Sequence, residues 1–297
     1  MHATARRLAD PEIGALDDIV DLKRYPLDRP DSTAFADLVS AARAGLANDG
    51  AIDFDGFLRP EALGRIAAQI TEASRHVPVH DVSTSVYVRD DLERDLPDDD
   101  PRRQATAWQA AYVTRDMLPA YGAAQRLYVS PAFKCFIAAC VAEDRVFEYA
   151  DPLAGLVANV LSPGGLTPWH YDTNEYVVTI MIQPAEGGGR FEYHHDLRRP
   201  GDENLDGLAE ALAGTGSAPR SVSHPAGTLQ LFRGRYSLHR VSPVEGARPR
   251  QVLVLSYSDR PGVIGPLDRT RKVYGRVTEA HLLAHEADQG AADGLIL

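Results

Sequence analysis

The sequence predicts a mainly β protein with flanking helices, built on a double-stranded β-helix, which is a jelly roll of the cupin-like kind. Two observations favour this fold. Short apolar runs bounded by Gly, Pro and Asp begin at residue 145, a pattern typical of a β-sandwich or barrel. The candidate metal ligands described below also fall on two such runs, where the open mouth of a jelly roll leaves room for a metal. The expected strands cover residues 146–149, 153–161, 176–182, 190–193, 228–232, 238–242 and 251–257.

The chain has 297 residues, a length that suits one large domain or two small ones. We predict a single domain over residues 1–297. Its expected parts are a surface arm (1–30), a helical N-terminal scaffold (31–143), the jelly-roll core (144–260) with an insertion (196–220), and a C-terminal helix and tail (261–297).

The N-terminal scaffold is expected to begin with a helix over residues 32–48. Ser32 is a suitable N-cap, and apolar residues recur behind it at helical spacing. A strand is expected over 51–58. A second helix then begins near Pro60, which suits the first turn, and ends at about residue 76.

Residues 77–103 are rich in Asp and Arg and predict either a solvated loop or a lid over an active site. In the lid interpretation, Arg102 and Arg103 would reach a substrate carboxylate. The sequence does not distinguish the two. A helical stretch over 118–142 follows, and Pro131 is expected to divide it.

Three further elements are expected towards the C-terminus. They are a helix within the insertion, a loop after the last strand and a final helix, at residues 204–213, 260–266 and 278–289.

Composition limits the classes of partner. The net charge of −11 argues against nucleic acid, because phosphate binding needs concentrated Lys and Arg. Small molecules are the expected partners, with neutral or cationic substrates open, and a homodimer is left open. No apolar run approaches eighteen residues, so no transmembrane helix is expected. Residues 1–18 lack the apolar region of a signal peptide, and we expect a cytoplasmic protein. Cys135 and Cys140 are too few for a disulfide framework.

The candidate site lies in residues 167–176, ahead of an apolar run. Residues two apart in an extended strand point to the same face, so His170 and Asp172 are expected side by side at a strand start. A third ligand has to come from a distant segment, and His239, flanked by strand-like residues, is the best candidate. Two His and one carboxylate on one face, with other positions open, are the ligand set of non-haem Fe(II) oxygenases.

Arg250 sharpens this hypothesis. It follows His239 by eleven residues and opens the last expected strand. Across an antiparallel hairpin its guanidinium could point back into the metal pocket and bind a carboxylate through two hydrogen bonds.

Together these residues resemble the 2-oxoglutarate- and iron(II)-dependent oxygenases, which pair His-x-Asp with a distal His and an Arg at about this distance. The resemblance implies that His170, Asp172 and His239 bind Fe(II). It implies that Arg250 holds the far carboxylate of 2-oxoglutarate and that O2 is the second cosubstrate. The order of the first helices and strand is also similar to that family, which implies that these helices pack on the major sheet. Asn159, polar within an apolar strand, is a candidate for contacting 2-oxoglutarate or for a structural hydrogen bond.

Four segments resemble the branch that contains the free amino-acid (lysine-type) halogenases and their hydroxylase relatives: 21–26, 169–178, 191–193 with the insertion after it, and 234–241. Halogenases of this fold carry Gly or Ala where this chain has Asp172, which favours hydroxylation or desaturation here. The expected reaction is hydroxylation of an unactivated C–H of a free amino acid or similar small polar metabolite, with release of succinate and CO2, in a biosynthetic pathway. The alternatives are a metal cupin that does not use 2-oxoglutarate and a non-catalytic jelly-roll binding module.

Two further residues near the metal ligands are candidates for contacting substrate. Asn174 shares the face of His170 and Asp172, so it could donate to cosubstrate or substrate. Trp169 is expected either as a pocket wall or as a core aromatic between the layers.

The remaining histidines are not expected to bind metal. Adjacent His194 and His195 would point to opposite faces of a strand. His224 is expected on the surface, and His281 and His285 are expected on the amphipathic face of the last helix.

Overall fold

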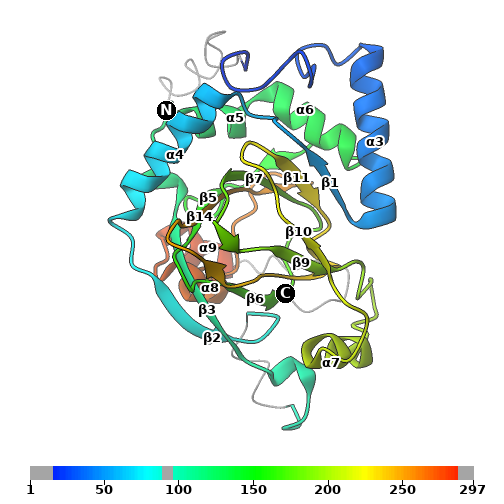
Figure 1. Ribbon diagram of the computed structural model, residues 1–297, viewed down its shortest axis with the longest axis vertical. Coiled ribbons are helices and arrows are strands. Elements are labelled where there is room, and N and C mark those ends of the chain that lie inside the picture. Colours follow the sequence, from blue (N-terminus) through cyan, green and yellow to red (C-terminus); the bar gives the residue numbers. More distant parts are fainter. Residues whose placement is uncertain (1–15, 89–95, 287–297) are drawn as a thin grey trace.

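The computed structural model describes residues 16–88 and 96–286, and two antiparallel sheets form its centre (Figure 1). The major sheet has the strand order β1-β11-β7-β14-β5-β3-β2, and the minor sheet has the order β10-β9-β12-β6. Side chains from both sheets line one cavity. This arrangement confirms the predicted jelly-roll core with flanking helices.

The major-sheet strands are β1 (Ala51–Phe54), β2 (His80–Thr84), β3 (Thr106–Val113), β5 (Leu156–Leu161), β7 (Val177–Gln183), β11 (Leu229–Phe232) and β14 (Arg250–Leu255). The minor-sheet strands are β6 (Thr167–His170), β9 (Phe191–His194), β10 (Arg220–Val222) and β12 (Leu238–Val241). Two short ribbons pair β4 (Phe147–Glu148) with β15 (Tyr257–Ser258) and β8 (Gly187–Gly188) with β13 (Val244–Glu245).

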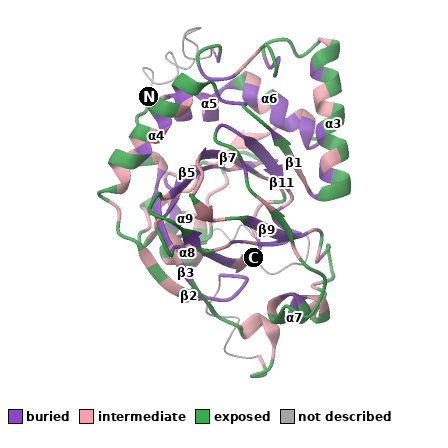
Figure 2. Cartoon of the chain, in the orientation of Figure 1, coloured by how far each residue is buried: buried purple, intermediate pink, exposed green. Residues whose placement is uncertain are grey.

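Four helices cover the face of the major sheet that points away from the cavity: α3 (Thr33–Asp49), α4 (Pro60–Ser74), α5 (Ala123–Val129) and α6 (Pro131–Cys140). Figure 2 shows them buried towards the sheet and exposed on the outside. Ser32 caps α3 by accepting a hydrogen bond from the Phe35 amide, and Gly50 ends it with φ 70°. Pro131 divides the last pair as expected, since proline suits the first turn of α6.

The strands of the major sheet alternate between this helical layer and the cavity. On β14, Leu253 and Leu255 belong to the core under the helices, whereas Val252 and Val254 line the cavity. This period of two follows from strand geometry. It also turns Asn159 of β5 into the cavity, next to its cross-strand partner Val252.

The segment predicted as a helical scaffold contributes more than helices. Besides the expected strand β1, which ends at Phe54 rather than at residue 58, it supplies β2 and β3. β2 crosses part of the stretch that was predicted as a loop or lid, and residues 89–95 of that stretch lie outside the described residues. β2 is an edge strand with mostly polar residues (His80-Asp81-Val82-Ser83-Thr84), so it contains no apolar run that would predict a strand.

The two ends of the chain close the core on different sides. The described part of the arm packs on it, with Ile19, Val20 and Leu27 buried. At the other end, α8 (Leu267–Tyr274), which was not predicted, lines the cavity, and α9 (Glu279–Glu286) packs against α8.

The insertion contains α7 (Leu205–Ala213), which confirms the helix expected over residues 204–213. It lies at the opposite end of the molecule from α3 to α6 (Figure 1). Among the helices formed by the described residues, none is both long and apolar enough to cross a bilayer.

Candidate active site

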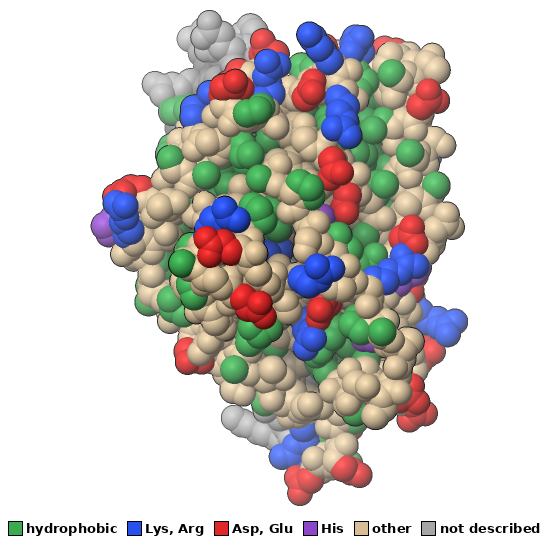
Figure 3. Space-filling model, in the orientation of Figure 1, with side chains coloured by type: hydrophobic (Ala, Val, Ile, Leu, Met, Phe, Trp, Pro, Cys, Tyr) green, Lys and Arg blue, Asp and Glu red, His purple; other side chains and the backbone are tan. Residues whose placement is uncertain are grey.

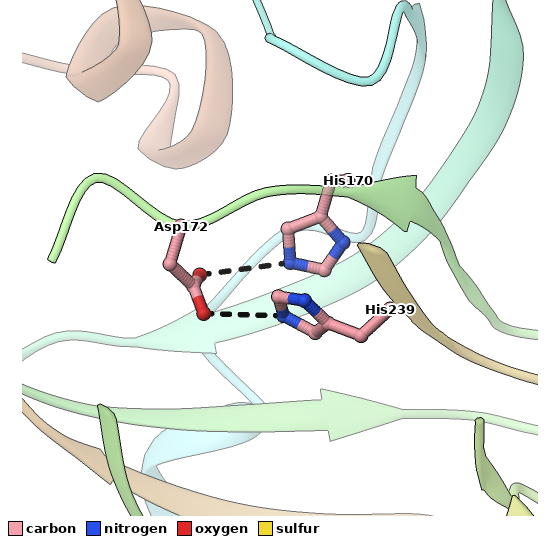
Figure 4. A group of neighbouring side chains, drawn as sticks. All are labelled: His170, Asp172 and His239. Carbon is pink, nitrogen blue, oxygen red and sulfur yellow. Dashed lines mark ion pairs between the residues drawn. The ribbon is translucent and has the colours of Figure 1, made fainter. Parts of the chain in front are cut away.

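His170, Asp172 and His239 come together as a compact group of metal-ligating atoms (Figure 4). β12 pairs with β6 so that His239 lies directly opposite His170, with ring centroids 4.1 Å apart. Nε2 of His170 lies 3.8 Å and Nε2 of His239 3.1 Å from the carboxylate oxygens of Asp172. One ligand atom from each residue lies within 4.8 Å of the others, so the three could hold a single ion.

The local backbone differs from the one expected. His170 is the last residue of β6, not the start of a strand, and Asp172 lies in the turn beyond it. Two main-chain hydrogen bonds hold this turn, from Tyr171 N to Val86 O (3.1 Å) and from Asp172 N to Gly234 O (3.1 Å). A Cβ on Gly234 would overlap the Asp172 carboxylate, so only glycine leaves room for it.

Hydrogen bonds fix both imidazole rings in the orientation that a metal requires. Nδ1 of His170 lies 2.8 Å from the carbonyl of Pro168, and Nδ1 of His239 lies 2.9 Å from the carbonyl of Ser237. A carbonyl can only accept, so each Nδ1 carries the proton and each Nε2 presents its lone pair to the centre. Such contacts set the tautomer and orientation of metal-binding histidines.

Burial and neighbouring charge give His170 and Asp172 the protonation states of metal ligands. Burial, with His239 next to it, lowers the pKa of His170 to about 3, so its imidazole is neutral at neutral pH. Burial would by itself raise the pKa of Asp172, but His239, which is also its hydrogen-bond partner, and His170 outweigh burial and hold that pKa well below its usual range. Neutral imidazole and ionised carboxylate are the forms in which His and Asp bind a divalent cation.

Arg250 lies in the same cavity, which has a volume of about 210 Å³. Its side chain is buried, burial alone lowers its pKa to about 10, and its Nε has no hydrogen-bond partner among the described residues. The Oδ1 atom of Asn159, in the same cavity, is likewise buried without a partner. A buried guanidinium needs an anion. The cavity therefore fits a carboxylate bound at Arg250.

The two candidate substrate residues differ in their position. Asn174 lines the cavity, where its Oδ1 accepts from the Tyr149 hydroxyl and its Nδ2 donates to the Tyr257 carbonyl (3.2 Å). Trp169 is not among the residues that line the cavity, so the expectation of a pocket wall is wrong. Its ring packs near His194 and lies under the Arg240 guanidinium, 4.6 Å away, because it points to the opposite side of β6 from His170.

Two histidines lie elsewhere than expected. His224 is buried in the cavity wall, within reach of Gln230 (2.9 Å) and Asp53 (3.3 Å), rather than on the surface. His281 is fully buried and paired with Asp151 at 3.0 Å, whereas His285 is exposed. Neither position shows in a one-dimensional pattern, because both depend on segments distant in the chain.

Sequence reasoning missed several polar residues of the cavity, among them Arg269 of α8 and Tyr149, because they belong to no motif. It had instead considered Arg102 and Arg103. These two arginines pair with Asp100 and Asp98 and do not line the cavity.

Comparison with known proteins agrees with the fold. The model of the Halogenase D family matches residues 36–267. No curated protein sequence is significantly similar to the chain.

Among solved structures, similar folds include the α-ketoglutarate-dependent epimerase SnoN from nogalamycin biosynthesis (12% identity, 75% of this chain and 83% of that chain, TM-score 0.52). AviO1 from Streptomyces viridochromogenes Tue57 is similar too (16% identity, 76% of this chain and 97% of that chain, TM-score 0.51). So is the α-ketoglutarate-dependent carbocyclase SnoK from nogalamycin biosynthesis (15% identity, 77% of this chain and 89% of that chain, TM-score 0.51). At these identities the likeness bears on the fold alone.

The jelly roll and its two-histidine, one-carboxylate group define an Fe(II)- and 2-oxoglutarate-dependent oxygenase, which uses Fe(II), 2-oxoglutarate and O2. The family model spans most of the chain. Within this class the chain therefore belongs to the Halogenase D family.

Proposed function

We propose that this enzyme hydroxylates an unactivated C–H bond of a free amino acid or a similar small polar metabolite, with release of succinate and CO2. The observation that carries the proposal is Asp172. Halogenases of this fold have Gly or Ala at this position, which leaves a coordination site for halide. Here the carboxylate is present and directed at both imidazoles.

In this proposal His170, Asp172 and His239 would hold Fe(II). Arg250 binds the far carboxylate of 2-oxoglutarate through charge-assisted hydrogen bonds, and Asn159 is a candidate for a further contact. Bound iron supplies the activation of O2 that is coupled to oxidative decarboxylation of 2-oxoglutarate.

The protein's own part is positioning and the exclusion of water. Pro168 and Ser237 hold the two imidazoles through their carbonyls. Valines at 157, 252 and 254 form an apolar wall beside the polar groups, and it limits the places that a substrate can occupy. Orientation of this kind lowers the barrier because the reacting groups are already held together.

The surface is consistent with a small-molecule substrate. On the face shown in Figure 3, Lys and Arg side chains are interspersed with Asp and Glu and form no extended basic patch. A cupin that does not use 2-oxoglutarate is the main rival. The buried Arg250, whose Nε has no hydrogen-bond partner in the described part of the chain, argues against it.

The decisive experiment is anaerobic reconstitution with Fe(II) and 2-oxoglutarate. Free amino acids and related metabolites would then be screened, on admission of O2, for succinate release coupled to a product heavier by one oxygen. We expect Asp172→Ala to lose this hydroxylation, because one of three ligands is removed.

The same reactions are run with added chloride to test the choice between halogenation and hydroxylation. A chlorinated product from the unaltered enzyme would contradict the proposal, as would a lack of succinate with every metabolite.

A further inference from the structure

Arg269 is a second guanidinium in the iron cavity. It lies on α8, near the group of His170, Asp172 and His239, and donates one long hydrogen bond, 3.3 Å, to the Tyr171 carbonyl. Its charge acts on the pKa of five groups around the cavity: His170, Asp172, Tyr112, Tyr149 and Tyr274. Among the described residues it has no carboxylate partner.

The charges at the loaded site leave Arg269 unbalanced. Asp172 and the two carboxylates of 2-oxoglutarate would balance the two positive charges of Fe(II) and the one of Arg250. Within the part of the chain that the structure describes, Asp172 is the only carboxylate that lines this cavity. The positive charge of Arg269 therefore remains in a partly desolvated site, where an uncompensated charge is unfavourable.

We propose that Arg269 binds a carboxylate of the substrate and that the part of the substrate beside the iron is neutral. The proposal rests on the function proposed above and names the chemical class of its substrate: a carboxylic acid with an uncharged body. A guanidinium presents paired donors that match a carboxylate, which fixes orientation as well as charge. The apolar wall formed by Val157, Val252 and Val254 suits an uncharged body.

Apart from Asp172, the described residues offer this cavity no carboxylate that could pair with a cationic side chain such as that of lysine. Glu143, Glu175 and Asp259 line a second cavity, which has a volume of about 500 Å³. Tyr149, Thr173 and Asn174 line both cavities, and the hydrogen bond from the Tyr149 hydroxyl to Asn174 lies in the shared wall.

The test is calorimetric binding under anaerobic conditions to the enzyme loaded with Fe(II) and 2-oxoglutarate. The probes are leucine, norleucine and phenylalanine, the carboxamide of each, and lysine. For the unaltered enzyme we expect at least one acid to bind at least about tenfold more tightly than its amide. Tenfold corresponds to about 1.4 kcal/mol, near the lower end for a hydrogen bond to a charged group.

Arg269→Gln should bind that acid and its amide about equally. It should retain the Fe(II) and 2-oxoglutarate affinity of the unaltered enzyme, in contrast to Arg250→Gln, which should lose 2-oxoglutarate affinity. Arg269→Lys should recover part of the preference for the acid. Arg271→Gln is the matched control, since Arg271 lies on the same helix but pairs with Asp268 at the surface.

Three results would overturn the proposal. They are no acid preferred over its amide, an acid preference that survives in Arg269→Gln, and lysine bound more tightly than norleucine. Weaker 2-oxoglutarate binding in Arg269→Gln would assign this arginine to the cosubstrate and would also refute it. Failure of the unaltered enzyme to bind Fe(II) and 2-oxoglutarate would instead refute the proposed function, so the two failures are distinguishable.

Discussion

Gly234 illustrates how one residue can preserve the metal group without contributing a ligand. It accepts the main-chain hydrogen bond of Asp172, and its lack of a side chain leaves space for the carboxylate. Its role resembles that of the two carbonyls that hold the imidazoles, since each residue sets the position of a ligand. Residues that support ligands in this way commonly change metal affinity about 10- to 100-fold when they are altered.

We expect Gly234→Ala to weaken Fe(II) binding about 10- to 100-fold, because the added methyl group displaces the Asp172 carboxylate. Anaerobic metal titration measures this affinity. Gly64→Ala is the control, because a Cβ on Gly64 of α4 has no atom within 4 Å and should leave metal affinity unchanged. Equal Fe(II) affinity in Gly234→Ala and the unaltered enzyme would show that the carboxylate position does not depend on this glycine.

At the scale of elements, one buried carboxylate holds the C-terminal helices against the core. Asp151, which precedes β5, accepts hydrogen bonds from the amides of Leu153, Ala154 and Gly265 and lies 3.0 Å from Nε2 of His281. It thereby ties the segment before α8 and the start of α9 to the major sheet. Because α8 carries Arg269, this contact also positions the cavity wall.

Asp151→Asn is expected to lower the free energy of unfolding by about 2–3 kcal/mol. The substitution replaces one accepting carboxylate oxygen with an NH2 group, which cannot accept the hydrogen bonds that the main-chain amides donate to Asp151. Denaturant titration measures the loss, and amide hydrogen exchange should rise in α8 and α9. Asp268→Asn, which alters an exposed ion pair, should change the free energy by no more than about 0.5 kcal/mol. Unchanged exchange in α8 and α9 would mean that Asp151 does not hold them.

At the scale of the whole molecule, several ionisable groups make stability depend on pH in the same direction. Hydrogen bonds and charge from neighbouring arginines outweigh burial and lower the pKa of Asp116, and they also lower the pKa of Asp18 and Asp100. These carboxylates stabilise the folded state above their unfolded pKa, and this stabilisation is lost as the pH falls through their folded pKa. Burial lowers the pKa of His170 and His194, so below about pH 6.5 the unfolded state takes up protons first.

For the metal-free enzyme, we therefore expect the free energy of unfolding to fall steadily as the pH drops from about 6.5 towards 4. His170→Gln should show a shallower fall, because it removes the histidine whose pKa is about 3 in the folded state. Denaturant titrations in the presence of a chelator measure both slopes. His285→Gln, at an exposed position, should keep the original slope. If His170→Gln showed the same slope as the unaltered enzyme, the His170 imidazole would not cause the loss of stability at low pH.

Much of this molecule follows from local patterns in the chain. The helix from Ser32, the division at Pro131, the helix of the insertion and most core strands correspond to capping residues, prolines and apolar periodicity. The elements missed include β2, β3, β10 and α8. β2 is a polar edge strand, and α8 is a short helix with many charged residues, so neither shows the apolar spacing that reveals buried elements.

The metal group was visible for a different reason. His-x-Asp, a distal His and an Arg behind it form a spacing that few other chemistries require. Asp172 shows the limit of that reasoning, because it reaches the group through a turn held by Val86 and Gly234 and not through a regular strand. The expected convergence of the three side chains was nevertheless correct.

The sequence alone thus specified the class of fold, the three candidate iron ligands and the arginine behind them, because those depend on residue type and spacing. The packing of distant segments determined the rest. It turned Trp169 away from the cavity, buried His281 against Asp151 and brought Arg269 beside the candidate iron ligands. Which side chains share a cavity depends on how far-apart elements pack, and no local pattern records that.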